Sequence, residues 1–192
     1  MKLWTIQAYH FWEVLQEQGT ITTDTRQIDK DWLDGEILDA YQWLASQMEQ
    51  RIGGRPHPDT LPLWAWYQWY GEKRKRPDLR SFGYIPSGQK GVRIEFEIED
   101  HLVILSDFDL WHAPLNRGYL GASYEDTERF YEETEGLSHD QLHTDPFYRQ
   151  QIVNSWQRIF DLDWKNENLR IQATFWQLNM KDVRDVTVFI SR

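Results

Sequence analysis

The chain has 192 residues, and its 21 basic and 31 acidic side chains give a net charge of −10. This charge argues against a protein that coats nucleic acid, because phosphate contacts require lysine and arginine. Cysteine is absent, which excludes disulfides, thiolate metal sites and cysteine nucleophiles. We find no signal peptide and no apolar run as long as a membrane span. We therefore predict a cytoplasmic protein without membrane contact, folded as one globular domain over residues 1–192.

Hydrophobic periodicity divides the chain into helices and strands. Helices are predicted where apolar residues recur every three or four positions, and strands where they alternate or form a short run. In chain order we expect a strand over 3–7, a helix over 8–18, an extended run over 20–23, a helix over 35–51, strands over 61–70 and 91–99, a strand from 103, helices over 123–135 and 145–160, and strands over 170–178 and 186–190. The pattern predicts an α+β fold, in which helices pack around a mixed or antiparallel sheet of about six strands.

Local signals refine several of these elements. Gly19 is placed to end the first helix, Asp34 to cap the second, and Pro146 to occupy the first turn of the last. The tryptophan-rich run 61–70 fits a strand with both faces covered, although its apolar pattern also suits a buried helix. The clean alternation of 91–99 indicates a strand with one exposed face.

The stretch Val103–Asn116 begins as a buried strand and ends in polar and aromatic side chains. Those side chains are Asp107, Asp109, Trp111, His112 and Asn116. Binding sites are often found where a rigid strand positions groups that the following loop exposes. We interpret the stretch as the floor and lip of a pocket.

Within this stretch, Asp107, Asp109 and His112 form the pattern D-x-D-x-x-H. Carboxylates and imidazole could bind a divalent metal. Alternatively, Asp107 caps a turn and His112 bonds to the backbone, because such spacings arise often by chance. His139 and His143 lie in a segment expected to be a loop, so their spacing is interpreted as coincidental. No G-x-S-x-G, P-loop or G-x-G-x-x-G motif occurs.

The chain contains 11 tryptophans, and amide side chains accompany some of them. Gln7 ends the first strand, and Gln172 shares one face of its strand with Trp176. A buried glutamine needs partners for both ends of its amide. Either these amides bond to neighbouring backbone, or they form a pocket of neutral donors and acceptors walled by tryptophans such as Trp64 and Trp66.

Residues 73–76 and Arg80 form the one dense basic cluster of the sequence. It is either a solvated loop or a clamp for an anionic group, in which Arg74 or Arg80 binds phosphate or carboxylate.

Several blocks of the sequence resemble a known bacterial family, domain of unknown function 3841. The blocks are LWTIQ, PLWAWYQW, LSDFDLWHAPLN, and SWQRIFDL followed by IQATFWQLNMKDVRDVTVF. The resemblance covers essentially the whole chain, and SDFDLWHAPLN is its most specific part. It implies a small soluble protein of bacterial or phage-associated origin and no particular activity.

The chain is more distantly similar to ADP-ribosyltransferases, in its opening strand and helix and in its closing pattern IQATFWQLNMKDVRDVTVF. That resemblance implies NAD binding between two small sheets. Thr5 and Gln7 would stand near the polar residue of the first strand, and Gln172 where a catalytic glutamate is expected. Glutamine cannot supply a negative charge or act as a base, so the likeness favours nucleotide binding over transfer.

Two hypotheses follow. The first is a module that binds a nucleotide-like or NAD-like small molecule. Its expected contacts are Gln7, Trp64, Trp66, Arg74, Arg80, Asp109, Trp111, His112, Asn116, Gln172 and Trp176. The second is an enzyme acting on that ligand, an ADP-ribosyltransferase-like protein or a metal-dependent hydrolase. His112 would then be the acid or base, with Asp107 or Asp109 orienting it or holding a metal.

Overall fold

The computed structural model describes residues 1–24, 35–81 and 83–192, and within them two antiparallel sheets form. The larger sheet has six strands in the order β6-β7-β4-β1-β5-β9. These are β1 (Lys2–Ala8), β4 (Leu63–Gln68), β5 (Lys90–Glu97), β6 (Ile104–Asp107), β7 (Ile171–Phe175) and β9 (Val183–Ile190). The smaller sheet consists of β3 (Thr60–Leu61), β2 (Thr20–Asp24) and β8 (Gln177–Asn179). With the helices, they confirm the predicted α+β class.

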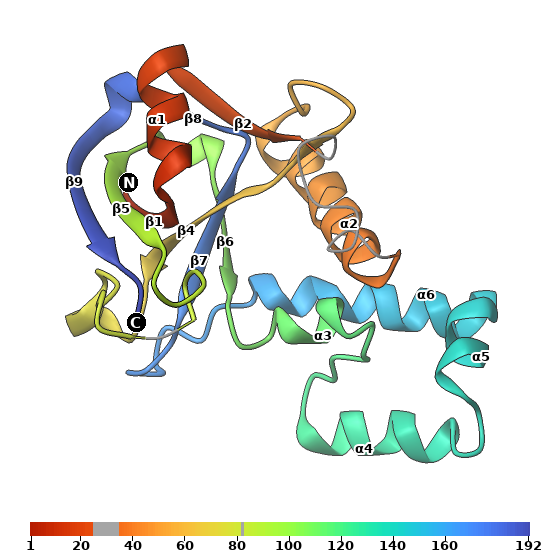
Figure 1. The fold of residues 1–192 in the computed structure, drawn as a ribbon. Helices are drawn as coiled ribbons and strands as arrows, with labels where there is room; N and C mark the ends of the chain where they lie inside the picture. Colours follow the sequence, from red (N-terminus) through yellow and green to blue (C-terminus); the bar gives the residue numbers. More distant parts are fainter. Residues whose placement is uncertain (25–34, 82) are drawn as a thin grey trace.

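Helix α1 (Tyr9–Gln18) lies against the larger sheet, and the other helices lie on its β6 side (Figure 1). These are α2 (Gly35–Ile52), α3 (His112–Leu115), α4 (Tyr124–Glu133), α5 (His139–Thr144) and α6 (Pro146–Ser155). Short 3-10 turns are η2 (Glu72–Arg74), η3 (Asp100–Leu102), η4 (Trp156–Phe160) and η5 (Met180–Asp182). Gly19 ends α1 at φ 74°, and Pro146 occupies the first turn of α6, as predicted, with Asp145 as its cap. The expected cap Asp34 lies outside the described residues.

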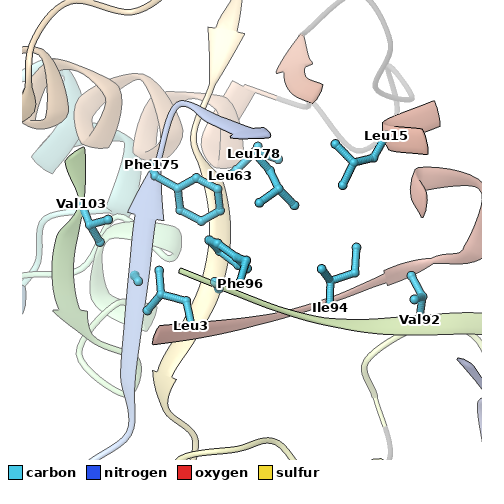
Figure 2. Packing of buried hydrophobic residues seen from close by; sticks show 11 residues of the cluster. Leu3, Leu15, Leu63, Val92, Ile94, Phe96, Val103, Phe175 and Leu178 are labelled. Carbon is cyan, nitrogen blue, oxygen red and sulfur yellow. The ribbon is translucent and has the colours of Figure 1, made fainter. Parts of the chain in front are cut away.

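One face of the larger sheet carries the first core cluster, shown in Figure 2. Leu3, Ile94 and Phe96 are fully buried, and the Phe96 and Phe175 ring centroids lie 5.2 Å apart. Leu15 of α1 packs into the same cluster. Each such side chain contributes about 1.5–3 kcal/mol when it leaves water. This face is therefore closed by α1 and by the smaller sheet.

The second core cluster contains α2 and the turns that follow β6 and α6. Leu44 and Met48 of α2 are fully buried with Ile159 of η4, and Ile104 of β6 belongs to the same cluster. Figure 1 shows α3 to α6 gathered beyond β6. The first and second clusters thus lie on either side of β4, β6 and β7.

The prediction of an exposed face on β5 holds at Glu97, which is exposed, and is wrong at Arg93. Arg93 is only 9% exposed, and its guanidinium donates to the Pro77 carbonyl at 2.9 Å and to Thr187 Oγ1 at 3.1 Å. Its polar residue type suggested solvent, but neighbouring carbonyl and hydroxyl groups satisfy the buried charge.

Three other segments differ from their predictions. The single strand expected over 170–178 is divided between the two sheets, with Trp176 at the break. The loop expected around His139 and His143 is the helix α5, where Ser138 and Gln141 form a capping box and the two imidazole centroids lie 4.4 Å apart. The turn expected after Asn179 is shorter, because β9 already begins at Val183.

Candidate functional site

Strand pairing brings several of the predicted site residues together. Trp66 on β4 is opposite Gln172 on β7, and Gln172 is opposite Ser106 on β6. One step along, Trp64 is opposite Thr174. Directly opposed side chains in an antiparallel sheet point to the same face. These residues therefore share one face of the larger sheet.

A cleft of about 420 Å³ opens on this face, and we call it the tryptophan cleft. Its lining residues are Thr5, Ile6, Gln7, Trp64, Ala65, Trp66, Trp69, Ser81, Gly83, Tyr84, Phe108, Arg170 and Gln172. Four residues predicted for the pocket are among them, namely Gln7, Trp64, Trp66 and Gln172. These four residues thus lie around one cleft, although Gln7 is opposite Val92 of the first core cluster and leaves β1 on the other face from Trp66.

Aromatic rings form one wall of the tryptophan cleft. The Trp66 and Phe108 ring centroids are 5.0 Å apart at an interplanar angle of 51°. The Arg170 guanidinium lies 4.6 Å from the Phe108 centroid, and its Nε donates to Asp109 Oδ2 at 3.0 Å. Because Asp109 compensates this cation, the wall offers flat apolar surface with little net charge.

Polar side chains with unused hydrogen-bonding capacity lie along and beneath the cleft. Gln172 Oε1 is buried without a hydrogen-bond partner in the described part of the chain, as are Ser106 Oγ and Thr174 Oγ1. Ser106 and Thr174 are fully buried. An unsatisfied buried group of this kind costs about 1–3 kcal/mol. By contrast, Gln7 Nε2 donates to Thr5 Oγ1 at 2.9 Å.

The segment around Tyr84 lines the cleft beside the aromatic wall. Tyr84 donates from its hydroxyl to the Asp78 carbonyl at 3.3 Å, and burial raises its pKa to about 12. Arg80, in the same segment, is exposed and pairs with Asp78, with Nε 2.9 Å from Oδ1. This pairing holds the Asp78 pKa well below its usual range. Arg80 therefore forms an ion pair within its own turn and does not line the tryptophan cleft.

The residues after β6 are engaged with one another. Asp107 Oδ1 accepts from the Asp109 and Leu110 N–H groups at 2.7 and 3.1 Å, and burial raises the Asp107 pKa. The exposed His112 has Nδ1 3.2 Å from the Asp109 carbonyl, and Asn116 Nδ2 donates to the His112 carbonyl at 2.7 Å. These contacts match the turn-capping interpretation. No three His, Asp or Glu side chains within the described ranges are grouped to hold a metal.

Trp111 and Trp176 lie in the second core cluster and do not line the tryptophan cleft. Trp111 is 4% exposed, and its ring centroid is 5.1 Å from that of Trp64, so it supports the cleft from behind. Tyr41 packs on both rings, and burial raises its pKa to about 12 despite the nearby Trp64 indole. Trp176 Nε1 donates to the Gly53 carbonyl at 3.0 Å.

Arg74 lies in a different hollow of about 700 Å³, which we call the basic cleft. Its lining residues are Tyr67, Gln68, Tyr70, Glu72, Lys73, Arg74, Lys75, Trp164, Lys165, Asn166, Glu167, Asn168 and Leu169. Neither Arg74 nor Arg80 therefore reaches the tryptophan cleft. The cation in that cleft is Arg170.

The family model described as "Domain of unknown function (DUF3841)" matches residues 2–184. The chain belongs to this family. Comparison with curated proteins gave no match, and neither did comparison with solved structures. The match to domain of unknown function 3841 includes every residue of both clefts. Across the described ranges of this family member, no helix combines the length and apolar character needed to cross a membrane.

The lining residues that sequence reasoning missed in this member of domain of unknown function 3841 include Trp69, Tyr84, Phe108 and Arg170. Phe108 and Arg170 directly flank β6 and β7, and the Phe108 N–H donates to the Arg170 carbonyl at 2.9 Å. Their positions next to the ends of strands could have marked them as candidates for the site. The sequence did not show that β6 pairs with β7, which is what brings the two residues together.

Proposed function

We propose that the tryptophan cleft binds the flat heterocyclic part of a nucleotide-like or NAD-like small molecule. The observation that carries this proposal is the Gln172 amide. Its buried Oε1 has no hydrogen-bond partner in the part of the chain that the structure describes, and the residue lines a cleft walled by Trp66 and Phe108. Because the family description names no activity, the proposal rests on this geometry.

Nucleobases and nicotinamide match these features. Stacking of a base on an aromatic side chain contributes about 1–3 kcal/mol. A ligand N–H bonded to Gln172 Oε1 would also remove a desolvation penalty of about 1–3 kcal/mol. Arg170 is already compensated by Asp109, which favours an uncharged ring over an anionic group. The volume of about 420 Å³ falls in the usual range of small-molecule sites.

The distribution of titratable groups favours binding over catalysis. The described residues that line the cleft include no Asp, Glu or His, which are the usual general acids and bases. Gln7 and Gln172 both line it. These are the two positions that the likeness to ADP-ribosyltransferases assigns to an NAD site, which supports NAD as the first probe.

A thermal-shift series with NAD, ADP-ribose and cyclic nucleotides tests the proposal. At a ligand concentration near 100 Kd, stabilisation of about 2.7 kcal/mol should raise Tm by roughly 5–10 °C. Gln172→Met should reduce the shift, because methionine keeps the side-chain length and removes the amide. An unchanged shift in Gln172→Met, or no shift with any probe, would contradict the proposal. A new chromatographic peak after incubation with NAD would replace passive binding with catalysis.

A further inference from the structure

The end of β4 separates the tryptophan cleft from the basic cleft. Trp66 and Trp69 line the tryptophan cleft, whereas Tyr67 and Tyr70 line the basic cleft. Tyr67 packs against the first core cluster. Neighbouring residues at the end of β4 therefore line two different clefts.

The aromatic part of the basic cleft includes an indole that the fold leaves exposed. The Trp164 residue is 61% exposed, and its ring stands edge-on to Tyr67 with centroids 6.3 Å apart at 89°. In its loop, Asp163 Oδ1 accepts from the Lys165 N–H at 3.1 Å. An exposed indole is a ready stacking surface.

Four cations line the same hollow: Lys73, Arg74, Lys75 and Lys165. Over the described ranges, none of the four forms an ion pair, even though the chain carries a net charge of −10. Lys75 Nζ lies 5.3 Å from the Tyr67 ring centroid, and the Arg74 guanidinium lies 5.9 Å from that of Tyr70. Arg170 and Arg80 differ, since both pair with aspartates.

The two loops that form the basic cleft are joined through Gly71. Its N–H donates to the Leu169 carbonyl at 3.1 Å. A Cβ at this position would lie 2.0 Å from the Glu167 carbonyl oxygen. The Tyr70 N–H donates to the Arg74 carbonyl at 3.0 Å. The backbone of the two loops that carry the cations and the indole is thus joined by hydrogen bonds.

We propose that the basic cleft binds a nucleoside phosphate, with the phosphate on segment 73–75 and Lys165 and the base against Trp164 and Tyr67. Uncompensated lysine and arginine suit phosphate, and aromatic faces suit any base. Glu72 and Glu167 also line the cleft. Their charge limits the anionic area to one small group and disfavours a continuous nucleic-acid backbone.

Calorimetric titration with AMP, adenosine and inorganic phosphate tests this site. Because adenosine could also enter the tryptophan cleft, the titrations use both the wild type and Gln172→Met. In Gln172→Met, AMP should bind at least about tenfold more tightly than adenosine or phosphate alone. Its affinity should fall as salt rises, because exposed charges are screened.

Paired variants locate the binding. Arg74→Ala with Lys75→Ala, and separately Trp164→Ala, should each weaken AMP binding at least about tenfold. The matched control is Arg149→Ala with Lys181→Ala, which removes the same charge from exposed positions outside the cleft and should leave AMP affinity unchanged.

Three results would overturn the assignment. Equal AMP affinity in the control and in the Arg74→Ala, Lys75→Ala variant would show that the cleft does not hold the phosphate. An oligothymidylate that binds about tenfold more tightly than AMP would assign the cleft to single-stranded nucleic acid. Loss of AMP binding in Gln172→Met alone would place the nucleotide in the tryptophan cleft.

Discussion

Ser106, Gln172 and Thr174, along and beneath the tryptophan cleft, bury polar atoms that have no hydrogen-bond partner among the described residues. Proteins retain unsatisfied buried polar groups of this kind chiefly at functional sites, where the groups lower the stability of the fold. If this holds here, the hydroxyl of Thr174 lowers stability, and a change that removes it should be measurable in the unfolding free energy.

Thr174→Val should raise the free energy of unfolding by about 1 kcal/mol, because valine keeps the β-branched shape and removes an unpaired hydroxyl. Thr5→Val is the matched control on β1. Thr5 is 2% exposed, and its hydroxyl donates to the Trp64 carbonyl at 2.9 Å, so its loss should cost about 1 kcal/mol. Urea unfolding of both variants measures the two changes in the free energy of unfolding. Equal destabilisation would show that the Thr174 hydroxyl makes a stabilising hydrogen bond.

Asp107 gives a prediction for pH dependence. Burial raises its folded-state pKa, so its contribution to stability is full below the unfolded pKa and is lost as pH rises through the folded pKa. Asp107→Asn keeps an acceptor for the Asp109 and Leu110 N–H groups and cannot ionise. Its stability relative to the wild type should therefore increase from acidic to neutral pH in denaturant unfolding. A relative stability that falls over this interval would contradict the assignment.

Among the connecting segments, Gly71 is the position that most constrains the basic cleft. Gly71→Ala should destabilise the protein by about 3 kcal/mol or more, because a Cβ meets the Glu167 carbonyl and φ is positive. Gly19 also has a positive φ, 74°, but its ψ of −14° is that of the left-handed helix whereas the ψ of Gly71 is 170°, and no described atom lies within 4 Å of the added Cβ of Gly19. Gly19→Ala should therefore cost only about 1 kcal/mol. Similar losses for the two variants in urea unfolding would show that the loop contact is unimportant.

The sequence was sufficient to predict most helices and strands, because their apolar spacing is a local property. α5 was missed although its capping box, Ser138 to Gln141, was readable in the sequence. The break at Trp176 could not be predicted, since it arises where β8 leaves the larger sheet to pair with β2. Pairing between distant strands leaves no trace in local periodicity.

For the molecule as a whole, the same limit explains which site residues were anticipated. Residue types that suit a pocket were recognised, and Trp66 and Gln172 do meet across β4 and β7. Trp111 instead fills the second core cluster, as large rings commonly do. Arg74 is separated from the tryptophan cleft because neighbouring residues at the end of β4 face different hollows. The residues expected in one pocket therefore line two clefts, the tryptophan cleft and the more positively charged basic cleft.

Calorimetric titration of uncharged adenosine and nicotinamide into the wild type, Trp66→Ala and Trp164→Ala tests the tryptophan cleft most directly. At least one probe should bind the wild type, and Trp66→Ala should weaken it about tenfold or more, since a base stacked on an indole contributes about 1–3 kcal/mol. Trp164→Ala, in the basic cleft, should leave that affinity unchanged. Equal affinity in the wild type and Trp66→Ala, or a loss confined to Trp164→Ala, would contradict a heterocycle site on this face of the sheet.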